Sequence, residues 1–386
     1  MVIKMFSEKM KFFEPSIFIK IREAMAKCEL PICDLSVGTP DMPPAGHIVD
    51  AFLSSSADME NYKYALADTA ELSDAVVEWY GRRFSVRLGR ENVCGLIGSQ
   101  DGLAHLPLML LDPGDGALIP NPGYPMFYTG PRLSSANIIF TPLCEDNGYL
   151  VDYDNISPSD AHSAKLLVIS YPANPLGRLA PMEFFEKTVW FAKKYDVTVI
   201  HDNAYVELIF DGKSGHSFLE AKGACDVGVE FNSLSKSYNL TGARISFMLG
   251  NPGICAALTR LKSNIDYGIF KPIQAMAVAA ITGPQDCLAG LRAEYQARRD
   301  ALCGALAEGG WAITPPQGTM FAWAKLPDKY PDSFAFTLDL LKSTGVALVP
   351  GISFGSLGEG HVRIGLVKPA AEMASAACKI AEFMRI

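Results

Sequence analysis

Residues 227–244 read VGVEFNSLSKSYNLTGAR, an apolar run followed by a loop rich in hydroxyl groups that contains one lysine, Lys236. Four further short apolar runs, each followed by small or polar residues or proline, lie upstream at 93–97, 117–119, 166–170 and 197–200. Helical-looking segments such as 182–195 lie between several of these runs. Short apolar strands that alternate with helices predict a mostly parallel sheet covered on both faces, which is the α/β class.

The predicted strands share polar or conformationally special residues at their ends. Examples are Gly98, Ser99 and Gln100 after the first run, and Asp202 and Asn203 after the fourth. Ligands of parallel sheets bind at the carboxyl ends of the strands. Five such ends in succession exceed what turn formation alone needs, so we predict a ligand-binding domain.

After about residue 285 the pattern changes to that of a smaller α+β domain. A long amphipathic helix is expected at 289–308, with Glu294, Arg298 and Arg299 on its polar faces. The elements expected after it are two short strands and a closing helix, at 321–324, at 346–349 and from Ala370. We therefore expect three parts, which are an N-terminal arm with part of the small domain at 1–47, a large domain at 48–285 and the small domain at 286–386.

The composition is that of a soluble globular protein. The 386 residues are 49% apolar and 20% charged, which allows a large buried core. The formal charge of −8 argues against a general nucleic-acid binder, which would carry a basic surplus. No apolar run is long enough to span a bilayer, and the charged start at 1–13 does not resemble a signal peptide. We expect a cytoplasmic protein with no membrane partner.

Nine cysteines are spread thinly along the chain, and none forms a Cys-x-x-Cys pair. The six histidines do not cluster near them. A zinc site or a disulfide framework is therefore not expected, and no metal is predicted. Reduced and mostly buried thiols fit a cytoplasmic protein.

Lys236 and its neighbours have the residue types needed to bind a phosphate and to offer an amine. Ser233, Ser235 and Arg244 could hold a phosphate, the arginine by its planar fork. The Lys236 amine could form a Schiff base if burial or cationic neighbours keep it partly neutral. A solvated loop with a structural arginine would have the same spacing, so the spacing alone leaves both interpretations open.

Residues 230–244 resemble the lysine motif S-x-S-K-x-x-x-x-x-G-x-R of the fold-type I pyridoxal-phosphate enzymes, the class I and II aminotransferases. Within that superfamily, 230–244 and 262–274 are most similar to the diaminopimelate aminotransferase-like branch. The resemblance runs from 35–44 to 362–367. It implies a mostly parallel seven-stranded sheet flanked by helices, a smaller α+β domain, and pyridoxal 5'-phosphate as cofactor.

The resemblance also assigns the residues around the cofactor ring. Asp202 would keep the pyridine nitrogen protonated. Tyr205 and Asn174 would contact the phenolic oxygen, and Tyr124 would stack on the ring. Taken separately, these residues could equally be a capping aspartate, a turn asparagine and core tyrosines. Their order along the chain favours the functional interpretation.

The family pattern places the cofactor phosphate at Gly98, Ser99 and Gln100, where backbone N–H groups open a helix expected at 103–111. Relatives have Lys-Glu after this serine, whereas this chain has Gln100-Asp101, which removes one cation.

The substrate residues implied by the resemblance lie near the two ends of the chain. Arg363 would clamp the α-carboxylate of the substrate, and Asn174 and the backbone of Gly38 would also contact the substrate. Leu366 departs from the family's R-x-x-F pattern.

Tyr64 matches the tyrosine that reaches the phosphate of the partner subunit, which implies a homodimer with shared sites. This match is weaker, because relatives have glycine where this chain has Thr69 and arginine where it has Ser73. Either the loop differs or Thr69 adopts an unusual backbone. Tyr62 is the alternative tyrosine.

The resemblance implies transamination from an L-amino acid to a 2-oxo acid through a Lys236 Schiff base, with Lys236, Asp202 and Tyr205 as catalytic residues. A C–S β-lyase or a decarboxylase shares these positions and stays open, and a non-catalytic effector-binding protein is the alternative from another class. The departures at Ala173, Leu176 and Ala243 leave the donor open.

Overall fold

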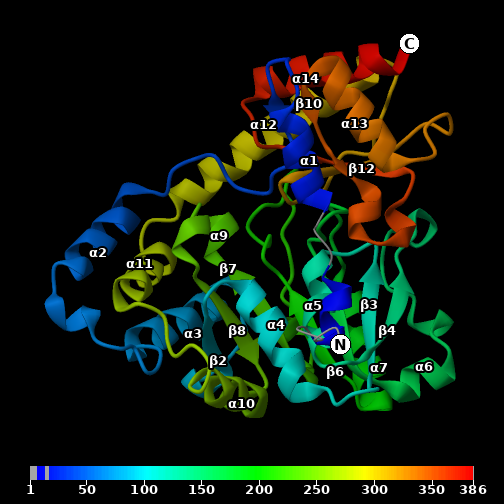
Figure 1. Cartoon of the computed structure of the whole chain (residues 1–386). Helices are drawn as coiled ribbons and strands as arrows, with labels where there is room; N and C mark the ends of the chain where they lie inside the picture. The colour runs from blue at the N-terminus through cyan, green and yellow to red at the C-terminus, as the bar shows by residue number, and fades with distance from the viewer. Residues whose placement is uncertain (1–6, 14–16, 386) are drawn as a thin grey trace, which may run out of the picture.

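The computed structural model describes residues 7–13 and 17–385 (Figure 1). The first residues of the expected N-terminal arm, and the start of the segment judged not to be a signal peptide, lie outside the described residues. The helices of the described part have these bounds: α1 Ile17–Ala26, α2 Gly46–Ser56, α3 Ala70–Phe84, α4 Ser99–Leu110, α5 Thr129–Leu133, α6 Pro158–Ser163, α7 Met182–Tyr195, α8 Ala224–Val227, α9 Leu234–Ser237, α10 Pro252–Lys262, α11 Lys271–Thr282, α12 Asp286–Glu308, α13 Ser333–Thr344 and α14 Ala370–Arg385.

The central sheet has seven strands, as the resemblance implied. Their order is β2 (Val93–Leu96), β8 (Ser246–Gly250), β7 (Gly228–Ser233), β6 (Thr198–Asp202), β5 (Ala164–Ser170), β3 (Gly116–Asn121) and β4 (Asn137–Pro142). Strands β7, β6, β5, β3 and β4 run parallel, and β8 is antiparallel to both β2 and β7. The mostly parallel α/β fold is therefore confirmed.

The five apolar runs of the sequence are β2, β3, β5, β6 and β7, and the sequence analysis missed β4 and β8. Strand β4 is an edge strand whose residues are mostly exposed or half-buried, so it lacks a continuous apolar run. Strand β8 is fully buried but follows Arg244 without a helix between them, so the alternating pattern did not reveal it.

Alternation along the strands builds a core on each face of the sheet. Leu166 and Val168 of β5 pack on one face with residues of α4 and α10. Leu167 and Ile169 point to the other face, where they pack with residues of α3, α7 and α11. Successive side chains of a strand point to opposite faces, so a strand buried on both sides is mostly apolar along its length.

A second group of elements lies over the carboxyl edge of the sheet. It contains the small parallel pair β1 (Cys33–Asp34) and β10 (Val346–Ala347), and the antiparallel sheet β11 (Val349–Pro350), β12 (His361–Gly365) and β9 (Phe321–Lys325). Helices α12 and α14 pack together there, and α1 packs on α13 (Figure 1). The strand expected at 346–349 is split between two sheets at Leu348. The boundaries after residues 47 and 285 stay a prediction.

Arg298 and Arg299, which we expected on polar faces of a long amphipathic helix, are buried side chains of α12. They are only 3% and 5% exposed. Arg298 pairs with Asp41, with an Nη1–Oδ1 distance of 2.7 Å, and Arg299 pairs with Asp211 at the same Nη1–Oδ2 distance. Asp41 and Asp211 come from distant segments, and helix periodicity does not reveal such counter-ions.

All nine cysteines are free thiols. The expectation that most are buried was too broad, since Cys94 and Cys255 are fully buried, Cys144 and Cys378 are exposed and the others are half-buried. Among the described residues, no helix combines the length and the apolar character needed to cross a bilayer.

Candidate active site

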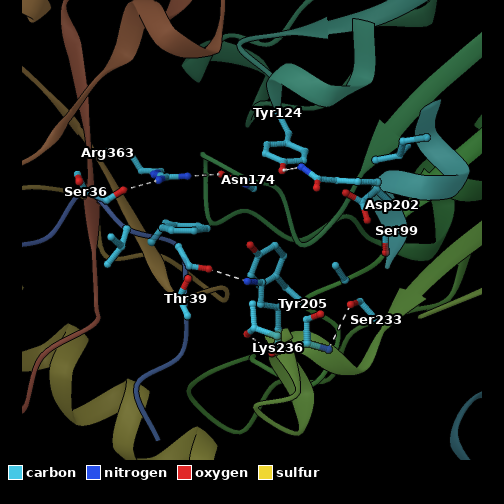
Figure 2. A pocket seen from close by; sticks show the side chains of 18 of the residues that line it. Ser36, Thr39, Ser99, Tyr124, Asn174, Asp202, Tyr205, Ser233, Lys236 and Arg363 are labelled. Atoms are coloured by element: carbon cyan, nitrogen blue, oxygen red, sulfur yellow. Dashed lines mark hydrogen bonds between the residues drawn. The ribbon is translucent and has the colours of Figure 1, made fainter. Parts of the chain in front are cut away.

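A cavity of about 420 Å³ opens where the carboxyl edge of the sheet meets β1, β9 and β12. Predicted site residues from distant parts of the chain line it together: Gly38, Ser99, Gln100, Tyr124, Asn174, Asp202, Tyr205, Ser233, Ser235, Lys236, Arg244 and Arg363. Figure 2 shows the labelled members of this set around one space. The strand ends singled out in the sequence therefore meet at one point, as expected for a parallel sheet.

Asp202 ends β6, and its carboxyl group is buried. Its Oδ1 has no hydrogen-bond partner among the described residues. Burial raises the pKa of Asp202 to about 6, although the neighbouring His201, the Ala204 N–H group and Lys236 act against the increase. A buried carboxylate oxygen without a donor is costly, and a cationic N–H group placed against it would satisfy it.

Lys236 lies in α9, directly after β7. Its Nζ donates a hydrogen bond to the Gly38 carbonyl oxygen at 2.6 Å. Burial lowers the pKa of Lys236 to about 8, and the positive charges of Arg363 and Arg244 lower it further, while Asp202 opposes them. A substantial fraction of this amine is therefore neutral and nucleophilic at moderately alkaline pH.

Arg363 lies in β12 and is buried. Its Nη1 donates to Asn174 Oδ1 at 3.1 Å and its Nη2 donates to the Ser36 carbonyl at 3.0 Å, as Figure 2 shows, while Nε has no partner among the described residues. Its guanidinium lies 3.9 Å from the ring centre of Phe321. Burial lowers the pKa of Arg363 to about 10. A buried guanidinium fixed in orientation, with no carboxylate partner among the described residues, is suited to bind a carboxylate.

The opposite end of the cavity is built for an anion. Gly98 caps the N-terminus of α4, and the buried Ser99 hydroxyl that follows has no partner among the described residues. Gly98 has φ +76°, and a Cβ there would collide with the Arg244 guanidinium. The N-terminal N–H groups of a helix, a free hydroxyl and an arginine together favour a phosphate.

Tyr124 and Tyr205 supply the aromatic surfaces of the cavity. Gln100 Nε2 donates to the Tyr124 hydroxyl at 2.9 Å, so the residue that replaces the family's lysine orients this ring. Tyr205 packs edge-to-face on Phe321, with 5.8 Å between ring centres. Burial raises the pKa of both tyrosines, which therefore stay protonated and able to donate.

Tyr64 and Tyr62 are not brought to this cavity. Tyr64 is 82% exposed, and its ring contacts Tyr267, while the Tyr62 ring contacts Phe270. Thr69 does not adopt an unusual backbone, since it has φ −70° and caps α3 with its side chain, which accepts from the Leu72 N–H group. The unusual backbone considered for Thr69 is therefore excluded, and Thr69 acts as the N-cap of α3.

Several lining residues were missed by the sequence analysis: Arg22, Met25, Asp34, Ser36, Val37, Thr39, Leu103, Ala204, Thr241 and Phe321. Ser36, Val37 and Thr39 lie within two residues of Gly38, and Thr241 lies within the lysine motif, so proximity in sequence could have indicated them. Arg22 and Phe321 carry no local signal, because only the packing of α1 and β9 brings them to the cavity.

Comparisons with known proteins find aminotransferases that match nearly the whole chain. The model of the family "Aminotransferase class I and II" matches residues 31–380. An LL-diaminopimelate aminotransferase of Dehalococcoides mccartyi is 40% identical over 383 residues, 98% of either chain. The glutamate-pyruvate aminotransferase AlaC of Escherichia coli is 39% identical over 341 residues, 87% of this chain and 83% of AlaC.

A substrate-bound structure of BacF from Bacillus subtilis matches this fold with a TM-score of 0.95 at 33% identity, over 99% of this chain and 98% of that one. The family match, the full-length relatives and the shared fold thus agree with the chemistry of the cavity. The chain belongs to the class I and II aminotransferases.

Proposed function

We propose that this aminotransferase works with pyridoxal 5'-phosphate held by Lys236, and that the cavity residues assigned above bind the cofactor and the substrate. The observation that carries the proposal is the position of Lys236. Its amine has a lowered pKa and shares one cavity with the unpartnered Asp202 carboxylate and the buried Arg363. The reaction class is transfer of an amino group from an amino acid to a 2-oxo acid.

The residues present fit this cofactor. The free Asp202 Oδ1 would accept from its protonated ring nitrogen, and Tyr124 would cover a ring face. The N-terminus of α4 with Ser99, helped by Arg244 and by Ser233 and Ser235, would hold the phosphate. Tyr205 and Asn174 would contact the phenolic oxygen. When bound, the cofactor supplies an electrophilic carbon and a ring that withdraws electrons from the substrate Cα.

Three residues of the chain would then handle the substrate. Arg363, held by Asn174 and Ser36, would fix the α-carboxylate and so direct the Cα–H bond toward Lys236. The freed Lys236 amine would take the proton from the substrate Cα and donate it to the C4′ carbon of the cofactor, acting first as base and then as acid. The backbone of Gly38 contributes the carbonyl that receives the Lys236 amine.

Family membership and the names of the relatives favour transamination over the β-lyase, decarboxylase and effector-binding alternatives. We also propose a homodimer to which each subunit contributes Tyr64, because an exposed apolar surface surrounds this residue. The nine free thiols support a reducing, cytoplasmic location.

The test is Lys236→Ala, with the exposed Lys222→Ala as control. We expect the variant to lose all amine-dependent formation of a 2-oxo acid from an amino donor and 2-oxoglutarate, because no base replaces the lysine. In the unaltered protein, the rate at which added cofactor binds should rise with pH, reach half of its maximum near pH 8 and level off above that, since the neutral amine reacts. Turnover by Lys236→Ala at the normal rate without added amine would contradict the proposal, as would ammonia release in place of amino transfer.

A further inference from the structure

Lys262 carries a buried charge that the proposed chemistry does not use. It ends α10, which packs on α4, and it does not line the cavity of the candidate active site. The residue is only 4% exposed. A buried ammonium group is costly unless carboxylates pair with it and accept its hydrogen bonds. The partners of Lys262 therefore indicate its role.

Two aspartates from different segments hold the Lys262 ammonium group. Its Nζ donates to Asp101 Oδ2 and to both carboxylate oxygens of Asp266, Oδ2 at 2.9 Å and Oδ1 at 3.1 Å. Burial acts to lower the pKa of Lys262, but the hydrogen bonds to Asp101 and Asp266 outweigh burial and raise this pKa. The ammonium group thus stays charged and joins two carboxylates that would otherwise repel each other.

Asp101 connects Lys262 to the first turn of α4. Its Oδ2 also accepts from the Ile97 N–H group at 2.8 Å, and its Oδ1 contacts His105 Nδ1 at 2.7 Å. Ile97 directly precedes Gly98, which caps α4 at the proposed phosphate site. The position of this turn therefore depends on the same carboxylate that pairs with Lys262.

Asp266 connects Lys262 to the exposed apolar surface around Tyr64. It lies in the loop that follows α10, directly before Tyr267. The Tyr267 ring contacts the Tyr64 ring, with 5.7 Å between ring centres, and the Tyr267 N–H group donates to the Lys262 carbonyl oxygen at 3.0 Å. Lys262 thus holds this loop through both its side chain and its backbone.

These contacts form one continuous chain of hydrogen bonds between charged groups. It runs from the proposed phosphate site at α4, through Asp101, Lys262 and Asp266, to the surface proposed as the dimer interface. A phosphate at one end and a partner subunit at the other would each stabilise the same arrangement of these groups. Two binding events that favour one arrangement strengthen each other by the same factor.

We propose that Lys262 is a positioning residue that links cofactor binding to dimer formation, by fixing the first turn of α4 and the loop before Tyr267 in one arrangement. The interaction surface is the apolar surface around Tyr64, and the partner is a second copy of this chain. The proposal rests on the proposed function, because it takes α4 to hold the cofactor phosphate and this surface to form the dimer.

The first experiment measures how much the cofactor strengthens the dimer. Dilution of fluorescently labelled protein gives the dissociation constant of the dimer with and without saturating pyridoxal 5'-phosphate, and the ratio of the two constants is the coupling factor. We expect a coupling factor of about 10 to 100 for the unaltered protein. Lys262→Met keeps an unbranched side chain without the charge, and we expect it to reduce the factor to about 3 or less. Lys262→Arg should recover part of the loss.

Arg260→Met is the matched control, since Arg260 is exposed in the last turn of α10 and the change also removes one positive charge. We expect this variant to keep the full coupling factor. A residue that only stabilises the fold would change both dissociation constants equally. An unchanged coupling factor in Lys262→Met would therefore overturn the proposal.

Asp266→Asn tests the same link without leaving two buried carboxylates unpaired. The amide keeps an oxygen for Lys262 and removes the charge, and the Asp266 side chain is partly exposed, so the chain should fold. We expect its coupling factor to fall at least threefold. If Lys262→Met does not fold, this variant decides, and a coupling factor equal to that of the unaltered protein would overturn the proposal.

The second experiment separates the phosphate from the ring of the cofactor. Pyridoxal has the same ring and aldehyde but no phosphate. We expect pyridoxal to strengthen the dimer less than pyridoxal 5'-phosphate does, and to act equally on the unaltered protein and on Lys262→Met. If Lys262→Met reduces the effects of both compounds by the same factor, the chain of contacts does not act through the phosphate site, and the proposal is wrong.

Failure of this inference is distinguishable from failure of the proposed function. If the unaltered protein binds no pyridoxal 5'-phosphate, or stays monomeric, the proposed function fails and the inference fails with it. If the unaltered protein binds the cofactor and dimerises, but the coupling factor is 1 or survives both Lys262→Met and Asp266→Asn, the inference alone is overturned.

Discussion

Asp202 combines a cost to stability with a role in the proposed chemistry. Its pKa in the folded chain is about 6, against a reference value of 3.8, because burial disfavours the charged form. The folded chain therefore binds more protons than the unfolded chain between pH 4 and 6. The contribution of Asp202 to stability falls as the pH rises through this window and stays low above it. At one pKa unit per 1.36 kcal/mol, the difference of about two units corresponds to about 3 kcal/mol at most.

We predict that Asp202→Asn stabilises the cofactor-free protein at pH 8 by up to about 3 kcal/mol and abolishes amino transfer. The amide has a similar shape without the charge, but it cannot keep a ring nitrogen protonated. Urea unfolding at pH 8 and pH 4 measures the effect, and the difference between variant and unaltered protein should shrink at pH 4. A variant that is less stable at pH 8 would contradict this account of the carboxylate.

The first turn of α4 depends on Gly98 in two ways. Its φ of +76° is a conformation that side chains disfavour, and a Cβ there would displace the Arg244 guanidinium. We predict that Gly98→Ala lowers the affinity for pyridoxal 5'-phosphate at least tenfold and destabilises the chain by about 1–3 kcal/mol. Fluorescence titration with the cofactor measures the change in affinity, and thermal unfolding measures the change in stability.

Gly290→Ala is the control for that prediction. Gly290 lies within α12, has an ordinary backbone, and a Cβ there would meet open space. This replacement should stabilise the chain by about 0.5–1 kcal/mol and leave cofactor binding unchanged. If Gly98→Ala behaves like Gly290→Ala, the α4 N-terminus does not depend on the glycine.

Elements were predictable from the sequence where the pattern is local. The range 182–195 is helix α7 to the residue, and the five apolar runs are five strands. Prediction failed where distant partners decide the environment. Arg298 and Arg299 were expected on polar faces of α12, yet both are buried and pair with Asp41 and Asp211 from distant segments. Helix periodicity describes one face of one helix and contains no information about the segment that covers it.

The folded chain has an exposed apolar surface near the loop that contains Tyr64. Its members lie on two segments that touch through Tyr64 with Tyr267 and Tyr62 with Phe270. They are Met59, Tyr62, Tyr64, Leu66, Ile265, Tyr267 and Phe270. Scattered exposed apolar side chains are ordinary, but a group gathered on two touching segments favours an interface.

We predict that the protein is a dimer and that Leu66→Glu shifts it toward monomer, because a charge in an apolar interface loses its hydration. Sedimentation velocity measures the shift. Tyr64→Phe should keep the dimer and reduce cofactor affinity about three- to tenfold, through loss of the hydroxyl that we propose reaches the phosphate bound by the partner subunit. Trp190→Glu is the control, since Trp190 is exposed on α7, outside this surface. A monomeric unaltered protein with full cofactor affinity would contradict the shared site.

The sequence by itself determined the α/β class and the order of the strand ends, and its motifs indicated Lys236, Asp202, Asn174 and Arg363 as candidate site residues. These features are local, because an apolar strand and the lysine motif each consist of consecutive residues. The tertiary structure alone decided that Arg22 and Asp34 face the same cavity as Arg363, and that Asp202 Oδ1 is left without a donor. Burial and the pairing of charges depend on which distant segments meet, and a linear pattern carries no distance between segments that are far apart along the chain.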